Sequence, residues 1–277
     1  MTFLYQIDDM FDATIISRPS KTCKSPYVAD VIVDGFGDTV YMAHAPSLGC
    51  GGLCETGCKI KVTLHPDPKT CTFVIQQAYV TGRNEEERTI VGIHPKHAEK
   101  IVNRSLHMGI IPTLDDVTYI KSEVKMLNSR FDFTCIDKNG VQTVVEVKHV
   151  PLADFEDITK KERKGKKYGD EYDWNSKISY FPDGYRKKAK DPVSPRALKH
   201  IQELERLKVE HGNNIRCIMC YVIQRPDSKV FQPSVLDEHY RNAFMNAYEN
   251  GVEIIPIQVE WDNNGECIYH GKLEINI

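Results

Sequence analysis

The sequence predicts an α+β protein in two parts, an all-β N-terminal barrel followed by a domain that mixes strands and helices. Segments rich in β-branched and aromatic residues follow one another to about residue 88, each bounded by Gly, Pro, Asp or Asn. The first helical pattern starts only at Pro95, and strand-like and helical patterns then mix to the end of the chain. We therefore expect one domain over residues 1–88 and a second over residues 89–277.

The first part contains strand-like segments with no helical pattern between them, which favours a small closed barrel. In order along the chain these segments are YVADVIVDG, DTVYMAHAPS, CKIKVTLHP and CTFVIQQAYV.

The second part begins with a helix from Pro95 to Gly109, since Pro suits the first turn and Gly a helix end. Further helices are expected at about 195–210, where Leu198, Ile201, Leu204 and Leu207 form an apolar stripe, and at 237–250. Strands are expected near 118–124, 131–136, 143–150 and 215–223, and in the final segment VEIIPIQVEW.

Composition limits the classes of function. A net charge of −3 and a pI near 6.4 exclude a uniformly basic nucleic-acid coat, so any polyanion site must be local. No apolar run could span a bilayer, and the acidic N-terminal segment does not fit a secretory signal. Nine cysteines, an odd number with several in strand-like runs, indicate a reducing compartment. We expect an intracellular protein that is neither secreted nor associated with a membrane.

A basic insertion at about 155–180, ITKKERKGKKYGDEYDWNSKIS, does not have the pattern of a packed element. It is either a solvated loop or an arm that contacts nucleic-acid phosphates, through Lys164, Lys166 and Lys167 among others.

The segment VVEVKHV raises the main question about function, because Glu146 and Lys148 lie on the same side of a strand that otherwise reads as buried. Upstream, SRFDF places Asp132 on one face and Phe131 and Phe133 on the other. The turn Asn139-Gly140 predicts a hairpin that folds Asp132 back toward Glu146.

The resulting pattern Asp-x13-Glu-x-Lys is that of the PD-(D/E)xK nucleases. Two carboxylates can share Mg²⁺ or Mn²⁺, which stabilises charge on a scissile phosphate, and a lysine can position the attacking water. Standing alone, the pattern would equally fit a surface ion pair.

Several segments occur together in an order that resembles the sugar fermentation stimulation protein (SfsA) family. These segments are KSEVKMLNSRFDF, VVEVKHV, YFPDG, ALKHIQEL and GVEIIPIQVE. The resemblance covers most of the C-terminal half and extends more loosely to YVADV and ETGC. It implies an OB-like barrel followed by a PD-(D/E)xK (restriction-endonuclease-like) mixed-sheet domain, with DNA binding as the usual activity.

Carried over residue by residue, the resemblance assigns catalysis to Asp132, Glu146 and Lys148, with Asp132 and Glu146 as metal ligands. Glu123 of SEVK matches a further glutamate, which either approaches the metal or pairs with Lys125 or Arg130. Nucleic-acid contacts are expected from Arg130 and from one helical face carrying Arg196, Lys199 and His200. Asp183 of FPDG is expected to cap the following turn.

One position departs from the family pattern. The family tends to carry a glutamate in the helix before SEVK, and the equivalent residue here is Arg104. Glu99 lies five residues earlier and is expected too far round the helix to replace it.

The glycine-rich loop LGCGGLCETGC contains Cys50, Cys54 and Cys58. Its spacing differs from the paired C-x-x-C of zinc sites, so a tight loop is preferred to a zinc site.

The sequence thus predicts a DNA-binding protein with a Mg²⁺- or Mn²⁺-dependent nuclease site. The alternative is a non-catalytic nucleic-acid-binding or regulatory module with a vestigial metal site. DNA is expected rather than RNA, and whether the chain forms a homodimer stays open.

Overall fold

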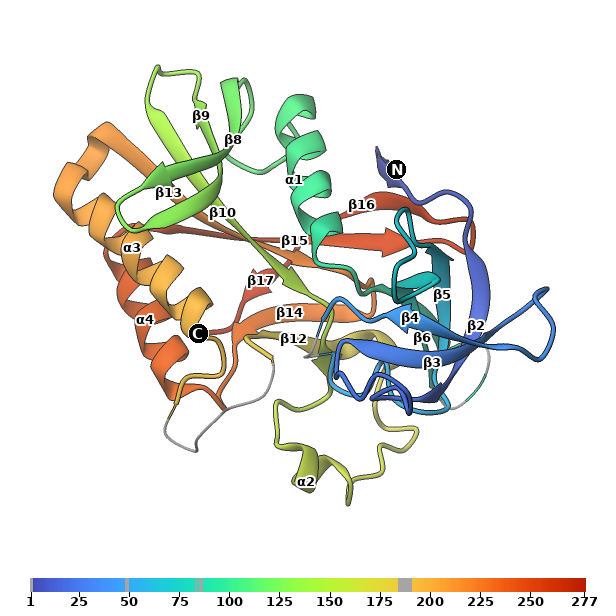
Figure 1. The fold of residues 1–277 in the computed structure, drawn as a ribbon. Coiled ribbons are helices and arrows are strands. Elements are labelled where there is room, and N and C mark those ends of the chain that lie inside the picture. Colours follow the sequence, from blue (N-terminus) through green and yellow to red (C-terminus); the bar gives the residue numbers. More distant parts are fainter. Residues whose placement is uncertain (1, 48–49, 83, 85–86, 184–190) are drawn as a thin grey trace.

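The computed structural model describes residues 2–47, 50–82, 84, 87–183 and 191–277. It is a mixed fold of helices and strands in which each assigned strand of the described residues belongs to one of three sheets (Figure 1). Within these described residues, no helix combines the length and apolar character needed to cross a membrane.

The N-terminal sheet closes on itself. Its strands run in the order β4-β3-β2-β5-β6-β7, and β4 also pairs with β6, so that β2 to β6 form a hydrogen-bonded ring. Apolar residues such as Val31, Val62 and Phe73 fill its interior. The bounds are β2 Phe11–Ser17, β3 Val28–Val33, β4 Val40–His44, β5 Lys59–Leu64, β6 Phe73–Thr81 and β7 Arg88–Gly92. The ring lies within the predicted first domain, while its likeness to an OB fold stays a prediction.

A seven-stranded sheet forms the centre of the second part, in the order β1-β16-β15-β13-β10-β9-β8. The three middle strands β10, β13 and β15 are parallel, and their neighbours are antiparallel. The bounds are β1 Thr2–Gln6, β8 Thr118–Met126, β9 Ser129–Ile136, β10 Gln142–Val150, β13 Ile215–Ile223, β15 Glu253–Trp261 and β16 Glu266–Lys272. The predicted range 1–88 therefore includes one strand, β1, that pairs with β16 of this sheet and not with the ring.

Helices cover both faces of the seven-stranded sheet (Figure 1). Helix α1 (Lys96–Met108) packs on one face, where Ile101 and Leu106 share an apolar cluster with residues of the sheet that include Leu4 of β1. Helices α3 (Pro195–His211) and α4 (Glu238–Glu249) pack on the other. Ser194 caps α3 by accepting a hydrogen bond from the Ala197 N–H, and Gly109 ends α1 at φ +63°. The three predicted helices are thus confirmed, with ends within a few residues of those expected.

A small sheet in the order β11-β12-β14-β17 joins the insertion to this core. Its bounds are β11 Ala153–Asp154, β12 Lys177–Phe181, β14 Ser228–Pro233 and β17 Glu274–Ile275. The insertion contains α2 (Lys160–Arg163) and the 3₁₀ turn η2 (Trp174–Ser176). A further 3₁₀ turn, η3 (Gly212–Asn214), follows α3.

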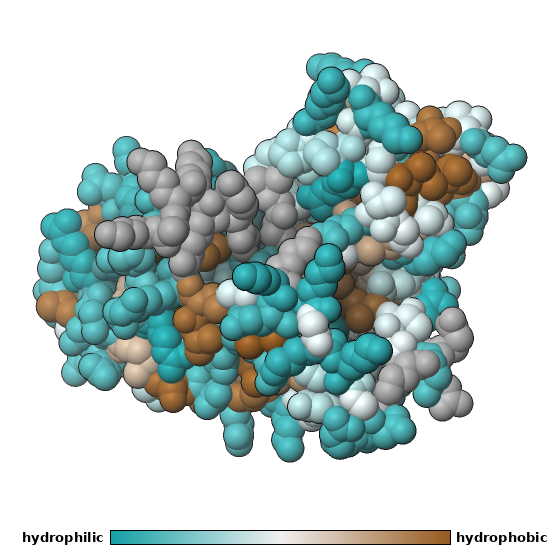
Figure 2. Space-filling model, turned by 90° about the horizontal axis from the view of Figure 1, so that it is seen from below, coloured by the Kyte–Doolittle hydropathy of each residue, from teal (hydrophilic) through white to brown (hydrophobic). Residues whose placement is uncertain are grey.

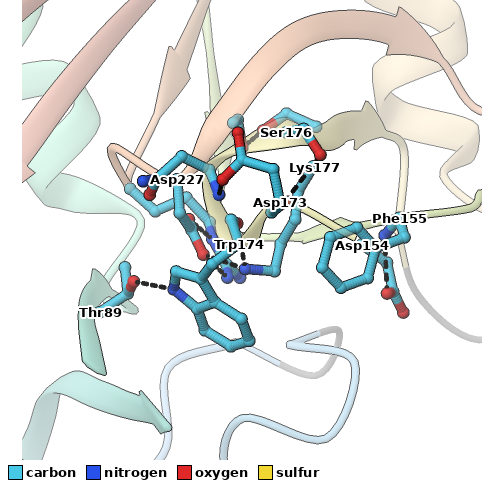
Figure 3. Close-up of polar contacts among 12 residues, drawn as sticks. Thr89, Asp154, Phe155, Asp173, Trp174, Ser176, Lys177 and Asp227 are labelled. Carbon is cyan, nitrogen blue, oxygen red and sulfur yellow. Dashed lines mark hydrogen bonds and ion pairs between the residues drawn. The ribbon is translucent and has the colours of Figure 1, made fainter. Parts of the chain in front are cut away.

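A buried ion cluster holds the end of the insertion in place. The Asp227 carboxylate accepts from Lys177 Nζ at 2.7 Å and from the Arg225 guanidinium at 2.6 and 2.7 Å. The Lys177 ammonium also lies 3.0 Å from the centre of the Trp174 ring, whose Nε1–H donates to Thr89 of β7 (Figure 3). Because all three charged groups are buried, the cluster requires each of its members.

Candidate active site

The β9–β10 hairpin brings the two predicted carboxylates to opposite positions. The strands pair from Gln142↔Ile136 to Val145↔Phe133, and Asp132 and Glu146 are the next residues beyond the last pair on each strand. Gly140, at φ +78°, lies in the connecting loop, as the Asn-Gly turn predicted. Beyond Phe133 the Asp132 Oδ2 accepts a hydrogen bond from the Val147 N–H at 2.7 Å. Where the backbone pairing of β9 and β10 ends, the Asp132 carboxylate therefore accepts the next β10 backbone N–H in place of a β9 carbonyl oxygen.

The predicted alternation of β9 is wrong at this point. Phe131 and Phe133 were expected on one face, but Phe131 packs with the α3 side of the sheet and Phe133 with the α1 side. The assigned β9–β10 ladder ends at Phe133, and from Phe131 to Ser129 strand β9 pairs with β8 alone.

Glu146 is the most buried acidic side chain of the site, with 2% of its surface exposed. Its Oε1 accepts from Lys148 Nζ and contacts His200 Nδ1. Its Oε2 is also buried and has no hydrogen-bond partner among the described residues. Burial alone would raise the pKa of Glu146, but the charge of Lys148 and the His200 contact together hold it below its ordinary value. Glu146 is therefore ionised at neutral pH.

Asp132 experiences the opposite balance. Burial first, and then the charge of Glu146, raise the pKa of Asp132 to about 7, although the Val147 N–H opposes the shift. One carboxylate is thus fixed as an anion, while its neighbour ionises only near neutrality. The negative charge of Glu146 opposes ionisation of Asp132, and a bound cation would reduce the repulsion between the two carboxylates.

A pocket of about 280 Å³ opens in front of these groups. Four acidic side chains and two basic ones contribute to its walls: Glu99, Asp132, Glu146, Asp183, Lys148 and Arg196. The carboxylates come from α1, β9, β10 and the segment after β12, which are far apart in the sequence. The site is therefore assembled by tertiary packing and not by one motif.

Glu99 corrects one sequence-based expectation. It was expected too far round the helix to replace the family glutamate at position 104. It lies in the first turn of α1 and lines the pocket, whereas Arg104 does not, although the side chains of both residues are exposed. Burial, together with the charges of Glu123 and Glu146, raises the pKa of Glu99 despite the opposing charge of Lys96. The helix start at Pro95 was the available signal, because it fixes residue 99 near the pocket end of α1.

Asp183 was expected to cap the turn that follows it, a turn that lies outside the described residues. The structure instead shows its place in the pocket wall. Sequence reasoning had not assigned it to the site.

The helical face predicted to bind phosphate divides into three environments. Arg196 lines the pocket beside the carboxylates. Lys199 is exposed and donates to the Asn128 carbonyl oxygen. His200 is buried against Glu146 and Phe131, so it does not share an exposed face with Lys199, and its predicted phosphate contact stays a prediction. The position is buried because α3 packs that side of the helix on the sheet.

Glu123 and Arg130 form an exposed ion pair of 3.4 Å on the β8–β9 hairpin. Of the two roles considered for Glu123, the structure shows the ion pair, and Glu123 is not among the residues that line the pocket. Its assignment as a metal ligand is therefore withdrawn.

The basic insertion is partly anchored. Arg163 pairs with Asp154 at 2.6 Å and donates to Tyr180 Oη at 2.7 Å, and Tyr180 lines the pocket. Lys166 pairs with Glu156, while Lys164 and Lys167 are exposed. The segment that carries the exposed lysines is therefore anchored beside the pocket by the contacts of Arg163 with Asp154 and Tyr180.

The cysteine loop packs into the ring. Cys50 and Cys54 are buried in its core, and Cys58 Sγ donates to the Gly52 carbonyl oxygen at 3.2 Å. Across the described part of the chain, no three His, Cys, Asp or Glu side chains are placed so that they could hold a metal ion as they stand. Cys50 also lines the active-site pocket, so the loop forms part of its wall.

Comparison with known proteins agrees with this arrangement. The model of a family described as "Sugar fermentation stimulation protein RE domain" (SfsA) matches residues 96–160 and 173–265, which is more than half of the chain. The chain belongs to the SfsA family. The resemblance drawn from the SEVK, EVK and FPD segments is therefore confirmed.

Two curated relatives match most of the chain. A sugar fermentation stimulation protein homolog of Dinoroseobacter shibae is 30% identical over 234 residues, covering 83% of this chain and 80% of the relative. A homolog of Thermosynechococcus vestitus is 28% identical over 235 residues, covering 83% and 82%. The structure of Pyrococcus furiosus SfsA in complex with Ca²⁺ covers 100% of both chains with a TM-score of 0.76 at 20% identity. That similarity establishes the fold of this SfsA-family chain.

Proposed function

We propose that this chain binds DNA and hydrolyses its phosphodiester bonds with a divalent cation held by Asp132 and Glu146. The observation that carries the proposal is the buried Oε2 of Glu146, which has no partner among the described residues and belongs to the same pocket as Asp132. A buried carboxylate oxygen without a partner is costly, and a metal ion is one way to satisfy it.

The donor set fits a hard cation. Asp132 and Glu146 supply carboxylate oxygens, and Glu99 and Asp183 are further oxygen donors in the same pocket. Oxygen donors suit Mg²⁺ and Mn²⁺. The Ca²⁺ of the P. furiosus protein, which shares this fold, supports a divalent-cation site. When bound, the cation would stabilise negative charge on the scissile phosphate.

The chain's own side chains would bind and orient the substrate. Arg196, in the pocket wall, can pair with a phosphate oxygen through two N–H groups. Lys148 Nζ, fixed by Glu146, lies where an ammonium can hold the attacking water or a phosphate oxygen. His200 holds the same Glu146 oxygen and keeps the carboxylate in one orientation.

The surface around the pocket suits a polar partner. Figure 2 shows a predominantly hydrophilic face with hydrophobic side chains in separate groups. Exposed Lys164, Lys167 and Lys199 would contact backbone phosphates, with DNA preferred to RNA. In this proposal the ring and the C-terminal α/β part act as two domains that grip one nucleic acid.

The second candidate is a nucleic-acid-binding module without catalysis. It is favoured by the absence of any group of three suitable side chains in metal-binding positions within the described residues. Lys148 and His200 both occupy Glu146 Oε1, so one carboxylate oxygen is already committed.

The two candidates are separated by cleavage of labelled single- and double-stranded DNA with Mg²⁺ or Mn²⁺. Glu146→Gln should abolish cleavage while DNA binding survives, and Glu249→Gln, an exposed control on α4, should cleave like the parent. EDTA should stop the reaction. Binding without cleavage under either metal would leave only the module.

A further inference from the structure

A second cavity lies beside the candidate active site and shares Pro95 with it as a lining residue. Its volume is about 570 Å³, within the range of small-molecule sites. The ring supplies most of its walls, and the start of α1 closes it. The lining residues used below are His44, Thr63, His65, Gln76, His94 and Lys96.

Two of its imidazoles accept a backbone hydrogen bond at the same ring nitrogen, Nδ1. His65 Nδ1 accepts a hydrogen bond from the Asp67 N–H at 3.0 Å, and His94 Nδ1 accepts one from the Lys96 N–H at 3.3 Å. A neutral imidazole that accepts at Nδ1 carries its proton at Nε2. Burial, then the neighbouring His44 charge, lowers the pKa of His94 to about 4. At neutral pH His94 is therefore a flat, uncharged ring with an N–H donor.

A hydrogen-bond chain fixes the polar groups of the wall. Buried His97 contacts Gln76 Oε1 through Nε2 at 2.7 Å, and Gln76 Nε2 donates to Thr63 Oγ1 at 2.8 Å. Because the Thr63 oxygen accepts this bond, its own hydroxyl proton is left to donate. Gln76 is held at both ends of its amide, so the wall is rigid before any ligand arrives.

We propose that this cavity binds one unpaired nucleobase of the strand whose phosphodiester bond is placed at Asp132 and Glu146. The inference rests on the proposed function and adds the substrate class, which is a single-stranded, flapped or extruded nucleotide and not a fully paired duplex.

The chemistry of the lining matches a base better than a phosphate. The imidazole rings and three prolines (Pro46, Pro66 and Pro95) offer flat faces for stacking, whereas among the described lining residues Lys96 is the single lysine or arginine that a phosphate could pair with. The N–H and O–H donors complement the carbonyl and ring-nitrogen acceptors that bases present. Lys96 is exposed at the cavity, where it can contact the adjoining backbone. Pro95 lines both this cavity and the carboxylate pocket, so the two lie next to each other at the start of α1.

The test uses an oligothymidine that contains one 2-aminopurine, a fluorescent base whose emission falls on stacking. Binding is measured in EDTA, so that cleavage does not contribute. The full chain is compared with His65→Ala, Thr63→Val and an exposed-histidine control, His211→Ala. We expect His65→Ala to weaken single-strand binding about tenfold, as loss of one stacking partner does. Thr63→Val should weaken it about fivefold, through loss of one hydrogen bond.

His211→Ala should behave like the parent chain, and the fluorescence change should be lost with His65→Ala. A blunt duplex of the same length should bind the parent and all three variants equally. Equal single-strand binding by His65→Ala, Thr63→Val and the parent would overturn the base site, as would no binding of the probe by the parent. Probe binding without cleavage in Mg²⁺ or Mn²⁺ would retain the base site and reject hydrolysis, so the two failures are distinguishable.

Discussion

Replacing Asp132 by Asn should stabilise the metal-free protein at alkaline pH. The pKa of Asp132 is raised to about 7, by burial first and by the Glu146 charge second. The folded state therefore holds this proton more tightly than the unfolded state does. Stability is greatest below the unfolded pKa near 4 and falls as the pH rises toward 7. Asn keeps an oxygen that can accept from the Val147 N–H but carries no charge.

The magnitude follows from the shift. A rise from an ordinary value of 3.8 to about 7 spans roughly three pKa units, which corresponds to about 4 kcal/mol once the group is ionised. At about pH 4 the same calculation gives less than ~1 kcal/mol. For a chain of this size, a gain of about 4 kcal/mol raises the melting temperature by roughly 8–16 °C.

The assay is thermal unfolding in EDTA at about pH 8.5 and about pH 4, with exposed Asp116→Asn as the control. Asp132→Asn should melt higher than the parent at the alkaline pH and close to it at the acidic pH. Adding Mn²⁺ at alkaline pH should raise the melting temperature of the parent and not of Asp132→Asn. A variant no more stable than the parent at alkaline pH, or equally stabilised at both, would refute the reasoning.

Three further changes follow from the described contacts. Lys148→Met should abolish cleavage while the dissociation constant for DNA changes little, since Lys148 contacts Glu146 inside the pocket; equal turnover by variant and parent would remove it from the reaction. Asp227→Asn should cost about 3–5 kcal/mol in urea unfolding because it leaves two buried cations underneutralised, and a loss below ~1 kcal/mol would contradict that view of the ion cluster. Burial lowers the pKa of His97 to about 2, so unfolded chains take up a proton that the fold excludes, and this residue should cost about 2 kcal/mol of stability between about pH 7 and 5. His97→Gln should remove that share and leave the shares of His94 and His149, whose pKa values burial lowers to about 4, whereas an unchanged slope in the variant would contradict the role of His97.

The hairpin at the centre of the site could be predicted because its determinants are local. The Asn-Gly turn fixes the loop, and the short loop brings the two strands into a register whose last pair, Val145↔Phe133, lies directly beside Asp132 and Glu146. The helices could likewise be predicted, α1 from Pro95 and Gly109 and α3 from its apolar stripe.

The features that were missed depend on tertiary packing. The entry of Glu99 into the pocket depends on how α1 docks on the sheet, which helical periodicity does not specify. The same holds for His200, since the side of α3 that meets Glu146 is fixed only by the crossing of helix and sheet. Strand β1 joins β16 across almost the whole chain length, and no local pattern reports such a pairing.

The most direct test of the account is a crystal of this chain grown with Mn²⁺ and measured for anomalous scattering. We predict a peak between the carboxylates of Asp132 and Glu146 that disappears in Glu146→Gln. A peak only at other residues, or none at a Mn²⁺ concentration that supports cleavage, would contradict it.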